Sequence, residues 1–242
     1  RAIALLTPVD QIVKQFLLGK AMRITTLVSP LKPEHDTTLH ALPFDVAQAK
    51  KLLDDAGWKD SDGDNVRDKM IDGVKVKFEF ELSCPSAPKT TVDIVKTIKD
   101  AMYQAGILVD IKTMDGPALQ KAMRKHDFDM AFSGVGNTSL PDDFTQLWAT
   151  SSWTSGGTNF CGFGNAESDK KIAQIAETVD YEKRVPLIHQ LEKMVYDEQP
   201  VIFMYYPNRK IVSHKRFGNT IYTFDRPGVL LNNFKLLSAT SD

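Results

Sequence analysis

The chain has 242 residues, enough for one large α/β domain or two small ones. Its 30 Lys and Arg residues nearly balance its 31 Asp and Glu residues. A chain without a strong field of one sign is a poor match for nucleic acid or an anionic membrane surface, so we expect no nucleic-acid partner. Its longest apolar run near the start, Ala2 to Leu6, is far shorter than the roughly 20 residues that a membrane helix needs.

The first clear helical pattern runs from Val46 to Ala56. Asp45 precedes it as a helix cap, and Gly57 follows it where a left-handed residue often ends a helix. The next stretch, from residue 60 to residue 68, reads DSDGDNVRD.

This stretch resembles the start of a calcium loop, with carboxylates at alternate positions. It lacks the Gly at position six and the Glu at position twelve that an EF-hand requires, and Asp and Gly also suit ordinary turns. Asp60, Asp62 and Asp64 are therefore only weak metal candidates.

The middle of the chain alternates strand and helix patterns. Val74 to Leu82 alternates apolar and charged residues, which predicts one strand with a buried face. The patterns that follow are a helix over residues 88–105 ended by Gly106, a strand over residues 107–111, a short helix capped by Asp115 with Pro117 in its first turn, and a strand over residues 128–133. Strands joined by helices favour parallel pairing, so the fold class is α/β and ligands should gather at the carboxyl ends of the strands.

The last third contains two more helices and an irregular tail. Ala166 to Val179 and Tyr181 to Asp197 are amphipathic, and Pro186 should bend the second helix because it removes a backbone hydrogen bond. Val201 to Tyr206 is a candidate buried strand. Residues 210–242 have little periodicity, as expected of a segment that packs on another part of a protein.

The sequence carries no motif of a known enzyme class. It has no Gly-x-Ser-x-Gly elbow, no phosphate-binding loop and no His-Glu-x-x-His, and its five histidines lack metal spacing. Cys84 and Cys161 also lack metal spacing and could either pair or remain free thiols. We predict no enzyme activity and no cofactor.

Several stretches in sequence order resemble one protein family. These are RAIAL at residues 1–5 with DQIV at 10–13 and Gly19, SPLKPEHD at 29–36, LPFDVAQAKKLLDDAGW at 42–58 and GFGNAESDKKIAQIAETVDYEKR at 162–184. Together they are similar to the peptide- and nickel-type solute-binding proteins, family five of the bacterial extracellular binding proteins.

The resemblance implies a two-lobed periplasmic-binding-protein type II fold with a central sheet and flanking helices. Residues 1–209 would form the C-terminal ligand-binding lobe, and residues 210–242 would return to an N-terminal lobe that this chain lacks. The chain starts without Met and almost inside a helical pattern, which favours a piece of a longer protein.

The implied function is capture of a peptide or another small solute in an interlobe cleft by hinge closure, for an ABC importer. Its partners would be the solute, the N-terminal lobe and the membrane permease. Its location would be periplasmic or otherwise extracytoplasmic, free or membrane-tethered. The alternative is a solute-sensing module that presents its ligand to a receptor.

The candidate ligand loop follows the predicted strand that ends at Ser133. Gly134, Val135 and Gly136 allow close approach of a ligand backbone, although glycines alone also suit a plain turn. Where the resemblance implies an Asp that pairs with a ligand amino group, this sequence has Asn137.

The stretch around Cys84 also departs from the family. The dipeptide binders place an Arg here for the ligand carboxylate, but residues 83–86 read SCPS. Longer peptides and non-peptide solutes stay open as ligands. Trp153 and Asn159 flank a polar loop and are further ligand-binding candidates, with core packing as the alternative. Core packing is favoured for Trp148, which shares a helical pattern with Phe144 and Leu147.

Overall fold

The computed structural model describes residues 1–136, 142–154, 157–223 and 228–237. Its first elements are α1 (Ala2–Leu5), α2 (Val9–Phe16), β1 (Ala21–Arg23), α3 (Val46–Asp55), β2 (Asp68–Ile71), β3 (Val74–Lys77), β4 (Glu79–Pro85), α4 (Lys89–Tyr103), β5 (Leu108–Met114), α5 (Gly116–Arg124) and β6 (Met130–Ala131). They are followed by α6 (Thr145–Trp148), η1 (Thr150–Ser152), α7 (Ala166–Glu177), α8 (Tyr181–Glu198), β7 (Tyr205–Pro207), β8 (Phe217–Gly218), η2 (Leu231–Asn233) and β9 (Lys235–Leu236).

The predicted parallel sheet is confirmed, with strand order β5-β4-β6. β4 pairs with β5 along its whole length, from Glu79 opposite Leu108 to Pro85 opposite Met114. β6 is shorter than predicted, because only Met130 and Ala131 pair with β4. In the described residues no strand pairs with the outer side of β6, which is therefore an open edge of the sheet.

The prediction of one strand from Val74 to Leu82 is wrong. The alternating stretch divides at Phe78 into β3, which forms an antiparallel hairpin with β2, and β4, which joins the parallel sheet. Asp72 and Gly73 turn the hairpin with φ of 50° and 81°, the left-handed geometry of a two-residue turn. Val74 is 62% exposed in this hairpin. Alternation of residue types does not reveal whether a strand packs on a core or projects from it.

The predicted helix boundaries rest on caps that the structure confirms. Asp45 accepts a hydrogen bond from the Gln48 backbone N–H (2.8 Å), and Asp115 accepts one from the Ala118 N–H (2.7 Å). Gly106 ends α4 with φ of 79°. Farther along, the predicted buried strand at residues 201–206 is replaced by the short, half-buried β7.

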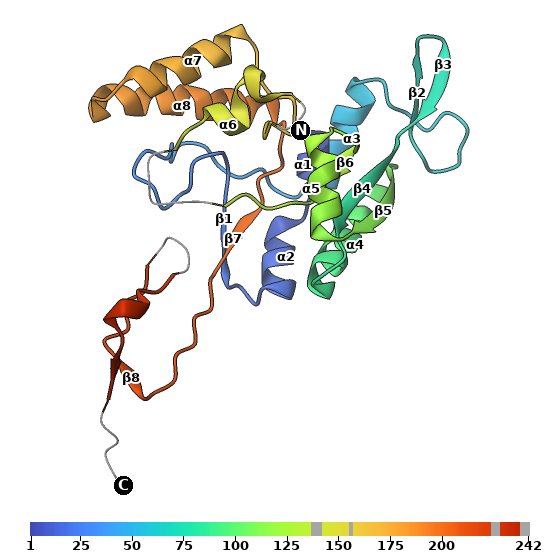
Figure 1. The fold of residues 1–242 in the computed structure, drawn as a ribbon. Coiled ribbons are helices and arrows are strands. Elements are labelled where there is room, and N and C mark those ends of the chain that lie inside the picture. Colours follow the sequence, from blue (N-terminus) through green and yellow to red (C-terminus); the bar gives the residue numbers. More distant parts are fainter. Residues whose placement is uncertain (137–141, 155–156, 224–227, 238–242) are drawn as a thin grey trace.

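Two apolar clusters form the core. The sheet cluster packs α1, α2 and α3 against β4, α4 and β5, and it includes Leu6, Leu82 and Ile107. The helix cluster joins α6, α7 and α8 and includes Trp148 and Leu191. Figure 1 shows the two groups of elements side by side, with α6, α7 and α8 on one side and the parallel sheet on the other.

A short antiparallel ladder leads from these clusters to the tail. β1 pairs with β7, with Met22 opposite Tyr206. After β7 the chain leaves the body and forms the small β8–β9 hairpin, which stands apart in Figure 1. Phe217 and Phe234 contact each other there, with ring centroids 5.9 Å apart.

Among the described residues, no helix combines the length and the apolar character needed to cross a membrane.

Candidate functional site

The candidate ligand stretch follows β6 at the open edge of the sheet. The last hydrogen bond between β6 and β4 runs from the Phe132 N–H to the Ser83 carbonyl (2.8 Å). Beyond it, Gly134, Val135 and Gly136 are exposed, and no hydrogen bond joins them to other described residues. Within the described part of the chain, their backbone N–H and C=O groups therefore have no hydrogen-bond partner.

The space beside the two glycines is also open. A Cβ atom placed on Gly134 or Gly136 would meet no described atom within 4 Å. Contacts with the described residues therefore do not account for the two glycines. Close approach of a ligand backbone would use the space that they leave.

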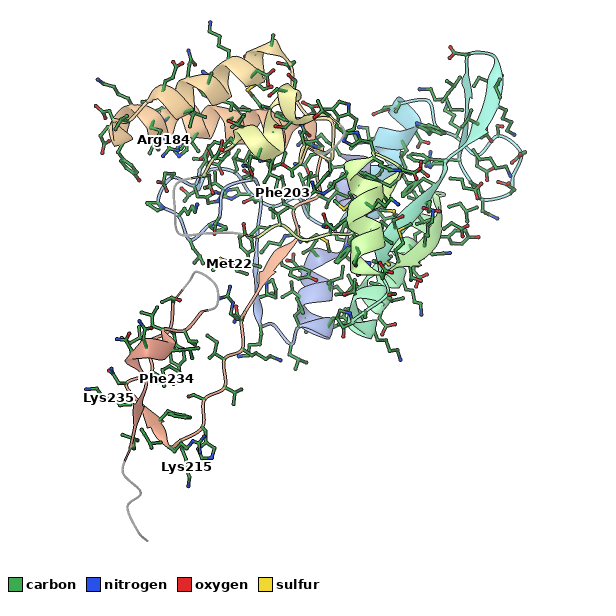
Figure 2. The ribbon with its side chains drawn as sticks, in the orientation of Figure 1. Met22, Arg184, Phe203, Lys215, Phe234 and Lys235 are labelled. Atoms are coloured by element: carbon green, nitrogen blue, oxygen red, sulfur yellow. The ribbon has the colours of Figure 1, made fainter. Side chains whose placement is uncertain are left out.

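Asp142 anchors the far end of the same connection. Lys32 Nζ donates to Asp142 Oδ1 at 2.7 Å, and the Lys32 side chain is only 10% exposed. Arg184 Nη2 donates to the Asp142 carbonyl at 3.3 Å from helix α8, where Figure 2 labels it. Phe144, two residues later, is buried in the helix cluster. The connection after β6 thus starts on the sheet and ends on the helix cluster.

Lys32 belongs to a segment that a buried carboxylate holds in place. Glu192 of α8 has no exposed surface, and its oxygens accept bonds from Thr26 Oγ1 (3.0 Å) and the Asp36 N–H (2.8 Å). His35 Nδ1 lies 2.9 Å from Oε1. Burial raises the pKa of Glu192, and these hydrogen bonds counteract part of that shift. This cluster has no local sequence pattern, because Glu192 and His35 are far apart in the chain.

The other predicted site residues lie in different surroundings. Asn137 is outside the described residues. Cys84 lies near the carboxyl end of β4, but its side chain is fully buried in the sheet cluster, and burial raises the pKa of its thiol. Cys84 and Cys161 are both free, which answers the question that the sequence left open.

Trp153 and Asn159 do not join the glycine stretch. The Trp153 ring is 44% exposed and stacks on His126, with centroids 3.6 Å apart. His126 precedes β6, whereas Gly134 follows it, so Trp153 lies toward the opposite end of that strand. Asn159 is fully buried. Its amide donates to the carbonyls of two residues of the surrounding loop, Ala149 and Phe163. A role of either side chain in ligand binding stays a prediction.

The aspartate loop is largely neutralised by lysines of the β2–β3 hairpin. Carboxylate oxygens of Asp60, Asp62 and Asp68 lie within 4.8 Å of one another. Lys75 Nζ contacts Asp62 at 2.7 Å and Asp68 at 3.3 Å.

Further hydrogen bonds fix the individual carboxylates. Lys77 pairs with Asp64, while Asp60 accepts bonds from the backbone N–H groups of Gly63 and Asn65. The Ser61 hydroxyl is the main cause of the lowered pKa of Asp68. A cation would have to displace Lys75 from Asp62 and Asp68, so Asp60, Asp62 and Asp64 stay weak metal candidates.

Comparison with known proteins identifies one family. Residues 1–157 match the family model described as bacterial extracellular solute-binding proteins, family 5 Middle. The chain is 30% identical over 211 residues to the oligopeptide-binding protein AppA of Bacillus subtilis, covering 85% of this chain and 38% of AppA. The solved structure of AppA in complex with a nonapeptide matches with a TM-score of 0.77 at 28% identity, over 85% of this chain and 41% of that one.

Two other relatives broaden the comparison. The nickel-binding periplasmic protein of Escherichia coli is 23% identical over 207 residues, covering 85% of this chain and 39% of that protein. An uncharacterized lipoprotein of Mycobacterium tuberculosis is 28% identical over 120 residues, covering 49% of this chain and 21% of that protein. The chain spans less than about two fifths of the length of these curated relatives.

Proposed function

We propose, from the premise that this chain belongs to family 5 of the bacterial extracellular solute-binding proteins, that it forms the C-terminal lobe of a solute-binding protein. The lobe would comprise residues 1–209 and would hold a solute noncovalently against a second lobe. Closure of two lobes about a hinge would bury the solute from both sides.

The observation that carries this proposal is the exposed backbone of Gly134, Val135 and Gly136 at the open sheet edge. An extended peptide can add to such an edge through main-chain hydrogen bonds, which require no particular side chain. The two glycines leave room for that approach.

The favoured solute is a peptide longer than a dipeptide, bound through its backbone. The described residues 83–86, SCPS, offer no cation for a ligand carboxylate. The similarity to AppA, whose structure was solved with a nonapeptide, supports the longer class. A non-peptide solute is the alternative, since a nickel-binding protein is also among the relatives.

The tail would pack on the second lobe. Residues 210–242 carry apolar side chains that this chain leaves in solvent, including Val212 (95% exposed), Leu231 (66%) and Leu236 (71%). Figure 2 shows Lys215, Phe234 and Lys235 on this tail, away from the body. Exposed apolar residues of this kind mark an interaction surface.

The whole protein would act outside the cytoplasmic membrane and deliver its solute to the permease of an ABC importer. A lipid tether is supported by the similarity to the mycobacterial lipoprotein. No covalent chemistry is part of this function.

A pair of variants of the whole protein tests the ligand stretch. Val135→Pro removes one backbone donor, whereas Val135→Ala keeps it and shortens only the exposed side chain. The probe is a pool of random nonapeptides with acetylated and amidated ends, with retention measured by native mass spectrometry. Val135→Pro should retain at least about tenfold less peptide than Val135→Ala. Equal retention by two folded variants would refute the backbone contact.

A further inference from the structure

Glu192 lies at the start of a chain of contacts that ends at the candidate ligand stretch. Its buried carboxylate makes hydrogen-bond contacts with three groups of the segment from residue 26 to residue 36, which we call the clamp segment. Thr26 contacts it from the first residue of this segment, and His35 and Asp36 from the last two. When Glu192 is ionised its carboxylate only accepts hydrogen bonds, and His35 would then donate to it from Nδ1.

The geometry of the contact indicates a positioning role. All three partners come from the clamp segment, so the side chain of Glu192 contributes nothing to the hydrogen bonds of its own helix. The clamp segment has no helix or strand. Its internal backbone hydrogen bonds form two short turns, Lys32 N–H to Ser29 O (2.9 Å) and His35 N–H to Lys32 O (3.2 Å). Val28 of the clamp segment is buried in the helix cluster, and the carboxylate adds the polar contacts at the two ends of the segment.

Lys32 passes this constraint to the connection after β6. It lies between the two points at which Glu192 holds the clamp segment, and its ammonium group contacts Asp142 at 2.7 Å. The ion pair is shielded, with side chains 10% and 23% exposed, so it is screened less than a surface pair. Asp142 lies six residues after Gly136, at the end of the connection opposite to the sheet.

We propose that Glu192 is a positioning residue for solute binding, which sets the ligand stretch Gly134–Gly136 through the clamp segment and the Lys32–Asp142 pair. This inference rests on the proposed function. The sheet fixes one end of the connection, while Lys32, Arg184 and the burial of Phe144 hold the other end. Glu192 acts on that end through Lys32, so loss of the Glu192 or the Lys32 contact should loosen it.

One readout needs no solute and therefore tests the inference independently of the proposed function. A nitroxide attached at Val135→Cys, in the whole protein with Cys84→Ala and Cys161→Ser, reports the motion of the ligand stretch by electron paramagnetic resonance. Glu192→Gln and Lys32→Met should each broaden its range of motion. A label at Val179→Cys, an exposed position between α7 and α8, should not respond.

The matched control lies on the same helix. Lys193 pairs with Asp197 at 2.7 Å, but both side chains are more than half exposed and face solvent. Lys193→Met removes a cation and an ion pair, as Lys32→Met does, without touching the clamp segment. It should leave the motion at position 135 unchanged.

Solute affinity gives the second readout, with the same capped nonapeptide pool. Glu192→Gln and Lys32→Met should each weaken retention by about tenfold. The double variant should be no weaker than either single one, because both substitutions act on the same anchor at Asp142. A variant with the two charges exchanged, Lys32→Asp with Asp142→Lys, should recover most of the peptide retention that Lys32→Asp alone loses.

The outcomes separate the two proposals. Unchanged label motion in folded Glu192→Gln and Lys32→Met variants, or additive losses of affinity, would overturn the positioning role. Altered motion together with no peptide retention by the unmodified protein would uphold the positioning role and overturn the proposed peptide function. Thermal melting of each variant shows whether the body remains folded.

Discussion

The body, residues 1–209, and the tail, residues 210–242, use similar apolar residues in opposite ways. In the body, Leu6, Ile107 and Leu191 have no exposed surface. In the tail, Leu231 and Leu236 are 66% and 71% exposed. The body therefore has the burial that stabilises a domain, whereas these leucines of the tail lack it. The difference shows that apolar content alone does not identify a core.

The largest expected effect on the free energy of unfolding comes from a substitution in the core of the body. Ile107→Ala would leave a cavity in the sheet cluster, where its side chain is fully buried, and should lower the free energy of unfolding by about 4 kcal/mol. Leu236→Ala, in the tail, should change it by less than about 0.5 kcal/mol. Urea unfolding of the 242-residue chain measures both. Comparable losses at the two positions would show that the tail has a core of its own.

A polar contact should matter almost as much to the body. Glu192→Ala would leave Thr26, His35 and the Asp36 N–H without their buried acceptor, which should cost about 3 kcal/mol of unfolding free energy. Lys193→Ala removes the neighbouring, exposed side chain and should cost less than about 0.5 kcal/mol. Urea unfolding again provides the measurement. Equal effects would mean that Glu192 is solvated.

The smallest effect concerns pH. Burial raises the pKa of Glu192 in the folded chain above its ordinary value of 4.5, so the folded state holds this proton more tightly than the unfolded state. The resulting stability is fully present below the unfolded pKa and is lost as pH rises through the folded pKa. The slope from one group is at most about 1.4 kcal/mol per pH unit.

The contribution of Glu192 to the pH dependence of stability can be isolated by comparing two variants. The free energy of unfolding of Glu192→Gln, subtracted from that of the unmodified chain, should fall as pH rises from 4.5. A chain ending at Arg209 should show the same difference, because Glu192 and its partners all lie in the body. A difference that rises with pH would contradict the raised pKa.

Local features of the sequence predicted much of the fold. Asp45 and Asp115 cap helices, Gly106 ends one, and the alternating and helical patterns around it form the parallel β4–α4–β5 unit. Each of these signals depends on neighbours within a few positions. They were therefore readable without the rest of the chain.

Features that join distant positions could not be predicted in this way. The alternation of residues 74–82 is the same in a projecting hairpin and in a buried strand, so β3 was assigned to the wrong sheet. The pairing of β1 with β7 and the convergence of Thr26, His35 and Asp36 on Glu192 leave no local pattern. In the candidate site, sequence located the glycine stretch but not the anchor at Asp142.

The ladder of β1 and β7 has a mechanical consequence. Its pairing continues at both ends, through the Ile24 N–H to the Met204 carbonyl (3.3 Å) and the Asn208 N–H to the Lys20 carbonyl (2.9 Å). A two-stranded ribbon resists stretching, since stretching breaks its bonds. We therefore expect the ribbon to keep its rungs while the tail, which continues from the end of β7, moves about the residues that follow Asn208.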